Sequence, residues 1–186
     1  MNSVERNPTG MHTGRPPLLE GARVISGLNI RLSVETDMEY WKLWINDPEV
    51  LPWFPVSSSE EIDVAARHVF SFVPRNAVLT AELEGRPCGI AGLDLPGYSK
   101  IRHQAMFSII VDKSCRNLGI GSALLQALLA AAKAWHGVSL VLLEVFEGNP
   151  ARSLYQRMGF VDFGFHPFYS KMEDQFLGRH LMCKAL

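Results

Sequence analysis

Two glycines mark the most informative segment of the chain, an otherwise helix-forming stretch between Cys115 and Trp135. Gly119 and Gly121 stand where the helical pattern begins, although glycine is a poor helix former. The first turn of a helix has unpaired N–H groups and a partial positive charge, so it attracts anions. Without Cβ atoms the glycines let a phosphate approach the backbone, and Arg116 adds a positive charge. The segment therefore predicts a phosphate-binding turn between a strand and a helix.

Other interpretations of the glycine pair are weighed against this one. A Walker A loop needs a lysine after its last glycine, and none follows Gly121. A dinucleotide fingerprint needs a third Gly or Ala where this chain has Leu124, and it lacks an acidic ribose partner at the usual distance. A plain turn with two glycines is the remaining alternative.

A second motif, EGNPARSLYQRMGF, occupies residues 147–160. Asn149 as N-cap, Pro150 in the first helical position and Gly159 past the end predict a short helix. Tyr155 lies on the apolar face of this helix, where a buried hydroxyl needs a partner. Tyr155 is therefore either a core residue or a group that meets a ligand.

The patterns on either side predict the elements that position these two motifs. Thr36 with Glu39, and Ser57 with Glu60, are spaced as capping boxes at the start of the first two helices. Apolar residues at helical spacing predict helices over 37–47, 57–73, 115–136 and 149–158, the third ended by Gly137. Strand patterns cover 28–34, 76–83, 88–95, 101–112, 139–147, 160–168 and 177–185.

Composition excludes several classes of protein. The 186 residues are 47% hydrophobic and 20% charged, as in ordinary globular proteins. The net charge of −1 does not indicate electrostatic binding of the whole chain to nucleic acid or to an anionic membrane. Cys88, Cys115 and Cys183 are scattered and fit neither a disulfide framework nor a zinc site, so no metal is expected. Cys115 as a nucleophile is an alternative without a visible partner base.

The chain is long enough for one domain with a real core. Residues 1–27 are rich in Pro and Gly and predict a flexible N-terminal tail, and residues 28–186 predict a single domain. No apolar run approaches the ~20 residues that span a bilayer, and no signal peptide is visible. We therefore expect a cytoplasmic protein without a membrane partner.

Residues 116–121, after a strand that ends in "SIIVD", resemble the R/Q-x-x-G-x-G/A pyrophosphate loop of the GNAT superfamily of N-acetyltransferases. Residues 147–160 resemble the asparagine, LY and GF signature on the same superfamily's penultimate helix. The element order matches too, and the resemblance covers roughly residues 28–186. It implies an α/β GNAT-type fold: a central mixed, mostly antiparallel sheet of about six to seven strands, flanked by four helices and splayed between strands 4 and 5.

The resemblance also implies acetyl-CoA as co-substrate, held between the two splayed strands. The pantetheine arm would pair with the backbone at Ile109 and Val111, as an added strand does. Asn149 matches a position that contacts the cofactor or an ordered water, which is compatible with its role as N-cap. The pyrophosphate would lie beside Arg116 and receive the backbone amides of Asn117, Leu118, Gly119, Ile120, Gly121 and Ser122.

For catalysis, Tyr155 matches the family tyrosine that protonates the departing CoA thiolate. An acceptor ammonium with a pKa near ~10 must first lose a proton, and many members use a glutamate on the fourth strand for this. This chain has Ala105 there and departs from the pattern. The candidates for the base are Glu144, which matches an acidic position used in some relatives, and His103, on the same strand face as Ala105. A water wire without a dominant base is the third alternative.

In this family the first two helices and the loop before the last strand select the acceptor. The first of these regions holds five aromatic residues: Tyr40, Trp41, Trp44, Trp53 and Phe54. We expect a small primary amine with an apolar part, such as an amino acid or a related metabolite. The alternatives are a protein N-terminus as acceptor and a non-catalytic module that senses acyl-CoA. A homodimer is expected only because dimers are common in the family.

Overall fold

The computed structural model of the chain describes residues 16–17, 25–172 and 174–186, so most of the predicted tail 1–27 lies outside the described residues. Its helices and strands follow the predicted order. They are β1 (Leu28–Leu32), α1 (Met38–Ile45), α2 (Ser59–Phe70), β2 (Val78–Leu83), β3 (Arg86–Asp94), β4 (Gln104–Val111), α3 (Ile120–His136), β5 (Leu140–Phe146), α4 (Ala151–Arg157), β6 (Val161–Met172) and β7 (Gln175–Ala185). Short 3₁₀ helices are η1 (Glu35–Asp37), η2 (Leu51–Trp53), η3 (Val73–Arg75), η4 (Ser99–Ile101) and η5 (Lys113–Cys115).

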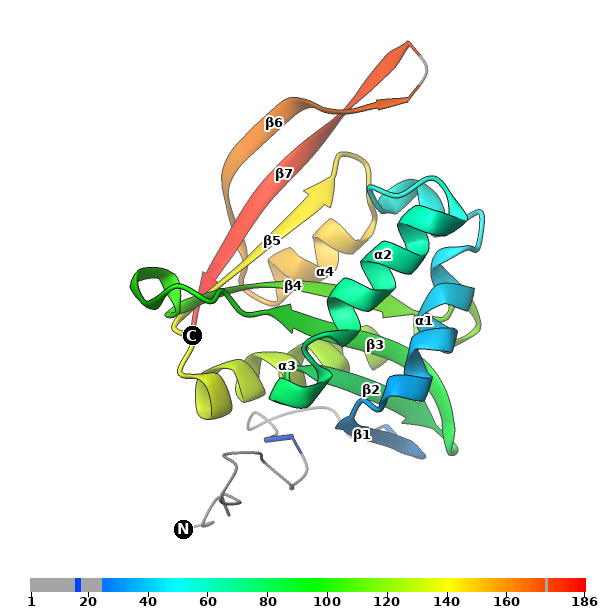
Figure 1. The fold of residues 1–186 in the computed structure, drawn as a ribbon, viewed down its shortest axis with the longest axis vertical. Helices are drawn as coiled ribbons and strands as arrows, with labels where there is room; N and C mark the ends of the chain where they lie inside the picture. The colour runs from blue at the N-terminus through cyan, green and yellow to red at the C-terminus, as the bar shows by residue number, and fades with distance from the viewer. Residues whose placement is uncertain (1–15, 18–24, 173) are drawn as a thin grey trace.

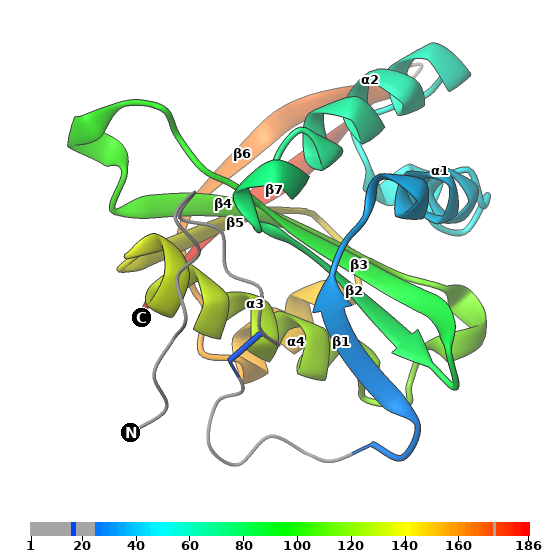
Figure 2. The ribbon, with the colours of Figure 1, turned by 60° about the horizontal axis from the view of Figure 1, so that its bottom comes forward.

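Within the described ranges the strands form one seven-stranded sheet in the order β1-β2-β3-β4-β5-β7-β6. Every neighbouring pair is antiparallel except β4 and β5, which run parallel. Figure 2 shows α1 and α2 on one face of the sheet and α3 and α4 on the other. The predicted mixed, mostly antiparallel α/β fold is confirmed.

The sheet opens in its middle, as predicted. Only residues 104–106 of β4 pair with β5, at residues 140–142, and the two strands then diverge (Figure 1). On its other side β4 stays paired with β3 up to Val111. From residue 107 to 111, therefore, the β4 edge that faces β5 has no strand partner in the described part of the chain. The gap lies at the C-terminal ends of the two strands.

Alternation along the strands decides which side chains reach which face. Ala105 and Phe107 of β4 and Leu143 of β5 belong to the core that packs under α3. Ile110 of β4 packs instead with the residues of α1 and α2. Odd-numbered residues of β4 and β5 thus face α3, and even-numbered residues face α2, a side that we call the α2 face.

Helix α3 behaves as its sequence predicts. Leu124, Leu125 and Leu128 are fully buried against the sheet. The helix ends at Gly137, whose φ of 65° is the left-handed conformation that glycine adopts without strain.

Helix α2 begins one residue later than its predicted capping box. Ser58, with an extended backbone, is the N-cap and accepts from the Glu61 N–H at 3.2 Å. The Glu61 carboxylate reaches back to the Ser57 N–H at 2.6 Å. The prediction of Ser57 with Glu60 was therefore wrong by one position, because Ser57 supplies a donor rather than the capping oxygen.

The start of α1 also differs from the prediction of a Thr36–Glu39 capping box. The Asp37 carboxylate accepts from the Val34 N–H at 3.0 Å, η1 forms, and α1 begins at Met38. A charged carboxylate is a stronger acceptor than a threonine hydroxyl, which explains the outcome.

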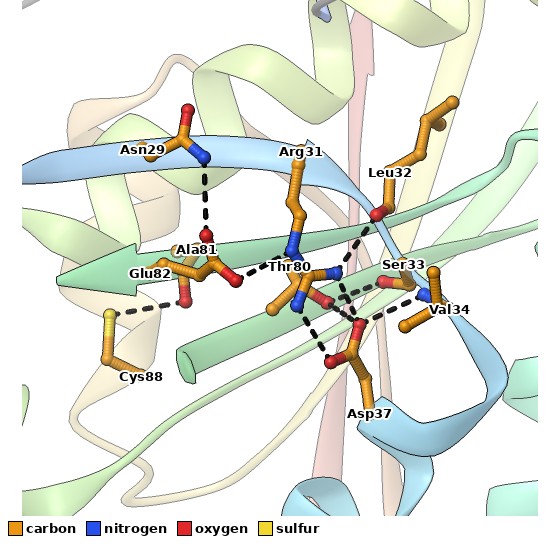
Figure 3. A network of polar contacts seen from close by, with 10 residues as sticks. All are labelled: Asn29, Arg31, Leu32, Ser33, Val34, Asp37, Thr80, Ala81, Glu82 and Cys88. Carbon is orange, nitrogen blue, oxygen red and sulfur yellow. Dashed lines mark hydrogen bonds and ion pairs between the residues drawn. The ribbon is translucent and has the colours of Figure 1, made fainter. Parts of the chain in front are cut away.

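Asp37 belongs to a buried polar cluster that joins α1 to the edge of the sheet (Figure 3). Arg31 donates from Nη1 and Nη2 to Asp37 at 2.6 and 2.9 Å, and from Nε to Glu82 at 2.7 Å. Nη1 also donates to the Leu32 carbonyl, and Thr80 donates to Asp37 at 2.8 Å. Burial raises the pKa of Asp37, but the hydrogen bonds from Arg31, Val34 and Thr80 outweigh it and leave the pKa below its usual value. Each guanidinium nitrogen of Arg31 has a partner, so the cluster is complete without a ligand.

Candidate active site

A cavity of about 940 Å³ passes through the gap between β4 and β5. One end is lined by the loop before α3 and by α4, and the other by α2 and the α2 face of the sheet. The volume is at the upper end of that of small-molecule sites. A cavity that joins both faces of the sheet can bring together two ligands that approach from opposite sides.

The two glycines at the start of α3 have different reasons to be there. Gly119 is the N-cap with a φ of 86°, which strains any residue with a side chain. Gly121 has no such φ, and an added Cβ would meet only Leu154 and Val111, at ordinary contact distances of 3.6 and 3.7 Å. Neither conformation nor packing requires glycine at position 121, so the backbone there is open toward the cavity.

The structure brings most of the predicted cofactor-binding residues to this cavity. Those that line it are Ile109, Val111, Arg116, Asn117, Gly119, Gly121, Ser122 and Asn149. The side chain of Leu118 is exposed and that of Ile120 is buried in the core, so neither lines the cavity. The prediction for Leu118 and Ile120 concerns their backbone amides alone and not their side chains.

The predicted start of α4 was wrong by one position. The helix begins at Ala151, so Pro150 is the N-cap and Asn149 precedes it. The side-chain oxygen of Asn149 still accepts a hydrogen bond from the Ala151 N–H, at 2.9 Å. Gly159 follows the helix with a φ of 84°, as the sequence predicts. Asn149 thus holds the start of α4 while it lines the cavity.

Tyr155 is buried between the sheet and the cavity. Its side chain is 8% exposed, and its ring meets Phe107 edge-on, with centroids 5.7 Å apart. No described residue hydrogen-bonds to its hydroxyl, although the residue lines the cavity. Burial raises the pKa of Tyr155, so the hydroxyl stays protonated at neutral pH. It is a proton donor without a protein acceptor.

Glu144 lies on the α2 face of β5 and lines the cavity. Its carboxylate forms an ion pair with Arg179, and the two groups approach to 2.7 Å between Oε2 and Nη1. The Arg179 guanidinium lies over the rings of Tyr169 and Phe146, 4.2 and 5.4 Å from their centroids. Arg179, on β7, also lines the cavity and was missed by the sequence analysis.

The structure places His103, the other candidate for the base, outside the cavity. It is exposed in the turn before β4, and its carbonyl accepts from the Ser139 and Leu140 N–H groups. That is the end at which β4 and β5 pair, whereas the cavity opens at the other end. Ala105 is buried on the α3 side, so β4 offers no acid–base group on the α2 face, where Met106 and Ser108 lie.

A second acid–base pair, also missed by the sequence analysis, lines the α2 side of the cavity. His68 of α2 and Asp94 at the end of β3 are joined by a 3.0 Å hydrogen bond between Nε2 and Oδ2. The bond occupies Nε2 and leaves Nδ1 as the free ring nitrogen. The two residues are 26 positions apart in the sequence. The only sequence feature that could have indicated the pair is Asp94, a charged residue at the end of an apolar strand.

Three of the five predicted aromatic residues lie at the cavity, while Trp44 is in the core and Tyr40 is exposed. Trp41, Trp53 and Phe54 line the cavity, whereas Tyr40 and Trp44 do not. Across residues 16–17, 25–172 and 174–186 there is no cluster of His, Cys, Asp or Glu suited to a metal ion. No helix in those ranges is long and apolar enough to cross a bilayer.

Comparison with known proteins agrees with this geometry. Residues 38–160 match the sequence family described as the acetyltransferase (GNAT) family. The chain is 28% identical over 108 residues to the L-amino acid N-acetyltransferase of Escherichia coli, covering 58% of this chain and 67% of that protein. It is 33% identical over 114 residues to an N-alpha-acetyltransferase of Sulfurisphaera tokodaii, covering 54% and 66%. The chain thus aligns with about two thirds of the length of these relatives.

A solved structure from Salmonella typhimurium, which contains its cofactor acetyl-CoA, superimposes with a TM-score of 0.74. The match covers 87% of this chain and 95% of the other at 19% identity, which shows a shared fold.

Proposed function

Because the chain belongs to the GNAT family of acetyltransferases, we propose that it transfers the acetyl group of acetyl-CoA to the primary amine of a small metabolite. One observation carries the proposal: a single cavity joins the glycine-bearing start of α3 to Tyr155 and Glu144. A binding site for an anionic cofactor and a set of acid–base groups are thus open to one another.

The residues at the gap fit acetyl-CoA. The free edge of β4 at residues 107–111 offers backbone donors and acceptors to an extended arm, as in strand addition. The open space at Gly121 and the charge of Arg116 suit a pyrophosphate at the start of α3. When bound there, acetyl-CoA supplies an activated thioester.

Tyr155 is the proposed general acid. Its hydroxyl is protonated, lacks a protein acceptor and lines the cavity, so it is available to protonate a leaving thiolate. Glu144 is the proposed base, because its carboxylate lines the same cavity. In the ion pair with Arg179, Oε2 is the oxygen that faces the guanidinium. The His68–Asp94 pair is a second group on the same side that can take a proton.

The proposed acceptor is a small amine with an apolar part, an amino acid or a related metabolite. Trp41, Trp53 and Phe54 give the α2 end of the cavity an apolar wall. The name of the Escherichia coli relative favours an amino acid, and that of the Sulfurisphaera tokodaii relative keeps a protein N-terminus as an alternative.

Further proposals concern the whole protein. We propose a cytoplasmic enzyme with one catalytic domain over residues 28–186 that binds no nucleic acid. We also propose a homodimer, supported by exposed aromatic side chains on β6 and β7, among them Phe163, Phe168 and Phe176. Light scattering in solution measures the mass directly.

Amine-dependent release of the CoA thiol tests the proposed function. The chain is incubated with acetyl-CoA and a panel of amino acids, simple amines and short peptides, and N-acetyl products are identified by mass spectrometry. We expect thiol and product in equal amounts with a small amine. Binding of acetyl-CoA without transfer to any amine would favour a sensor module instead, and transfer only to peptides would favour N-terminal acetylation.

A further inference from the structure

Arg179 stands out because its hydrogen-bonding capacity is largely unused. The side chain is only 13% exposed, and it forms an ion pair with Glu144, in which Nη1 lies 2.7 Å from Oε2. Its Nε is buried and has no acceptor among the described residues. Leaving a buried donor unsatisfied destabilises the folded state. The guanidinium is therefore held in place without a complete set of partners.

The aromatic rings explain how the guanidinium is held. Tyr169 lies 4.2 Å from it and Phe146 5.4 Å, an arrangement that orients the planar group and limits its access to water. Arg179 pairs with Phe146 in the β5–β7 register, and Glu144 lies two residues earlier on the same face. The α2 end of the cavity thus presents a carboxylate and a guanidinium side by side.

We propose that Arg179 binds the carboxylate of the acceptor, so that the substrates are amino carboxylates of the α-amino acid type. The inference rests on the proposed function and specifies its acceptor class. The guanidinium of Arg179, which lines the cavity, donates to the acceptor carboxylate, while the acceptor amine lies toward Glu144. A guanidinium matches a carboxylate in shape and charge and bonds it strongly.

Charge balance favours a zwitterion over a simple anion. Arg179 is already paired with Glu144, and an acceptor with only negative charge would place a second anion beside that carboxylate. An amino acid brings its own ammonium group and leaves the net charge of the site unchanged. The partly buried position strengthens each of these interactions relative to water.

Arg152 offers a matched control. It is ion-paired to Asp162 at 2.9 Å, and its Nε is likewise buried without an acceptor among the described residues. It does not line the cavity. A substitution at Arg152 therefore repeats the loss of an ion-paired arginine without touching the proposed carboxylate site.

The test compares acceptors that differ only in the carboxylate. Leucine, leucinamide and 3-methylbutylamine form one set, and phenylalanine, phenylalaninamide and 2-phenylethylamine form another. For the wild-type chain we expect kcat/KM to be about 10- to 100-fold higher for the acid, the factor that a hydrogen bond to a charged group supplies. Acetylation of amides and amines as efficient as that of the acids would overturn the inference and leave the proposed function standing. Failure to acetylate any member would refute both.

Two variants locate the effect. Arg179→Gln should reduce the preference for the acid to within a few-fold, with the loss in KM rather than in kcat. Arg152→Gln should keep the wild-type preference. An Arg179→Gln protein that retains the full preference, or an Arg152→Gln protein that loses it equally, would contradict the assignment. If Arg179→Gln does not fold, Arg179→Lys replaces it, and the preference of the wild type and of Arg179→Lys for the acid over the amide decides whether the assignment holds.

Discussion

Two arginine clusters in this chain have similar components and different degrees of completion. At the edge of the sheet, Arg31 uses Nε, Nη1 and Nη2 on Asp37 and Glu82 (Figure 3). In the cavity, Arg179 uses Nη1 on Glu144 and leaves a buried Nε unsatisfied. The first cluster is complete within the protein, and the second has donors left over.

The difference separates structural from functional polar groups. A fully bonded buried network rigidifies the fold and gives a ligand nothing to bind. Arg152 also has a buried Nε without an acceptor among the described residues, but only Arg179 combines unused donors with a place on the cavity wall, where a ligand can meet its guanidinium. Tyr155 follows the same rule, because its hydroxyl lines the cavity without a protein acceptor.

Tyr155→Phe is expected to have the largest effect on chemistry. The ring and its contact with Phe107 remain, so stability should change little. Loss of the general acid should reduce the rate of acetyl transfer about 10²- to 10⁴-fold, with acetyl-CoA affinity nearly intact. Single-turnover transfer is the measurement, because slow product release would hide the effect in steady state.

Tyr40→Phe is the matched control, since Tyr40 is exposed and does not line the cavity. Full single-turnover activity in Tyr155→Phe would make Tyr155 a packing residue.

Asp37→Asn probes the complete cluster and should act on stability instead. Removing the charge leaves Arg31 with Glu82 as its one acidic partner, and we expect a loss of about 2–4 kcal/mol in the free energy of unfolding. The lowered pKa of Asp37 also sets a pH dependence. Its contribution is fully present above the unfolded value of about 4 and is lost as pH falls through the folded value.

Urea unfolding between pH 7 and pH 3 checks both effects. The wild type should lose stability below about pH 4, and Asp37→Asn should show a weaker dependence there. Equal pH dependence in the two proteins would assign the acid sensitivity to other carboxylates.

Gly121→Val should weaken cofactor binding while the fold is kept. A Cβ added at this position meets only ordinary contacts, so the variant should fold. Affinity for CoA should fall at least about 10-fold, because the resembled loop has only Gly or Ala here and a branched side chain occupies the approach of the pyrophosphate. Calorimetric titration of CoA measures it.

Gly97→Val is the control, because a Cβ added there would meet nothing within 4 Å and the residue does not line the cavity. Unchanged CoA affinity in a folded Gly121→Val protein would refute the phosphate site.

Glu144→Gln should have the smallest and most pH-dependent effect. At low pH the acceptor is an ammonium and needs a base, so kcat/KM should fall most there and recover as pH rises. His68→Ala tests the second pair in the same way. Small and pH-independent losses in both variants would favour proton release through water.

The residues proposed to hold the cofactor could be singled out from the sequence because they are local in it, and most of them line one cavity. The turn at Gly119 and Gly121 and the short helix with Tyr155 lie in two contiguous segments, and their spacing alone suggested their chemistry. The strand and helix order followed from periodicity, and the structure confirms it. The capping boxes failed by one position or by the choice of acceptor, since Ser57 and Asp37 take part in bonds that a spacing rule does not see.

The acceptor half could not be predicted because it is assembled by tertiary structure. Arg179 meets Glu144 only through the register of β7 against β5, and His68 meets Asp94 only after α2 packs on the sheet. The sequence pattern places His103 on a strand face but does not show which end of β4 separates from β5. Long-range strand pairing decides which end separates, and it places His103 at the end away from the cavity.

The comparison of the two arginines is tested most directly by urea unfolding of Arg31→Gln and Arg179→Gln, measured side by side. Arg31→Gln leaves Asp37, whose side chain is 3% exposed, without its main partner, and we expect a loss of about 3–5 kcal/mol. Arg179→Gln removes one partly exposed ion pair and a ring contact together with an unsatisfied donor, and we expect a loss of about 1 kcal/mol. A loss for Arg179→Gln equal to that for Arg31→Gln would contradict the account and make both clusters structural.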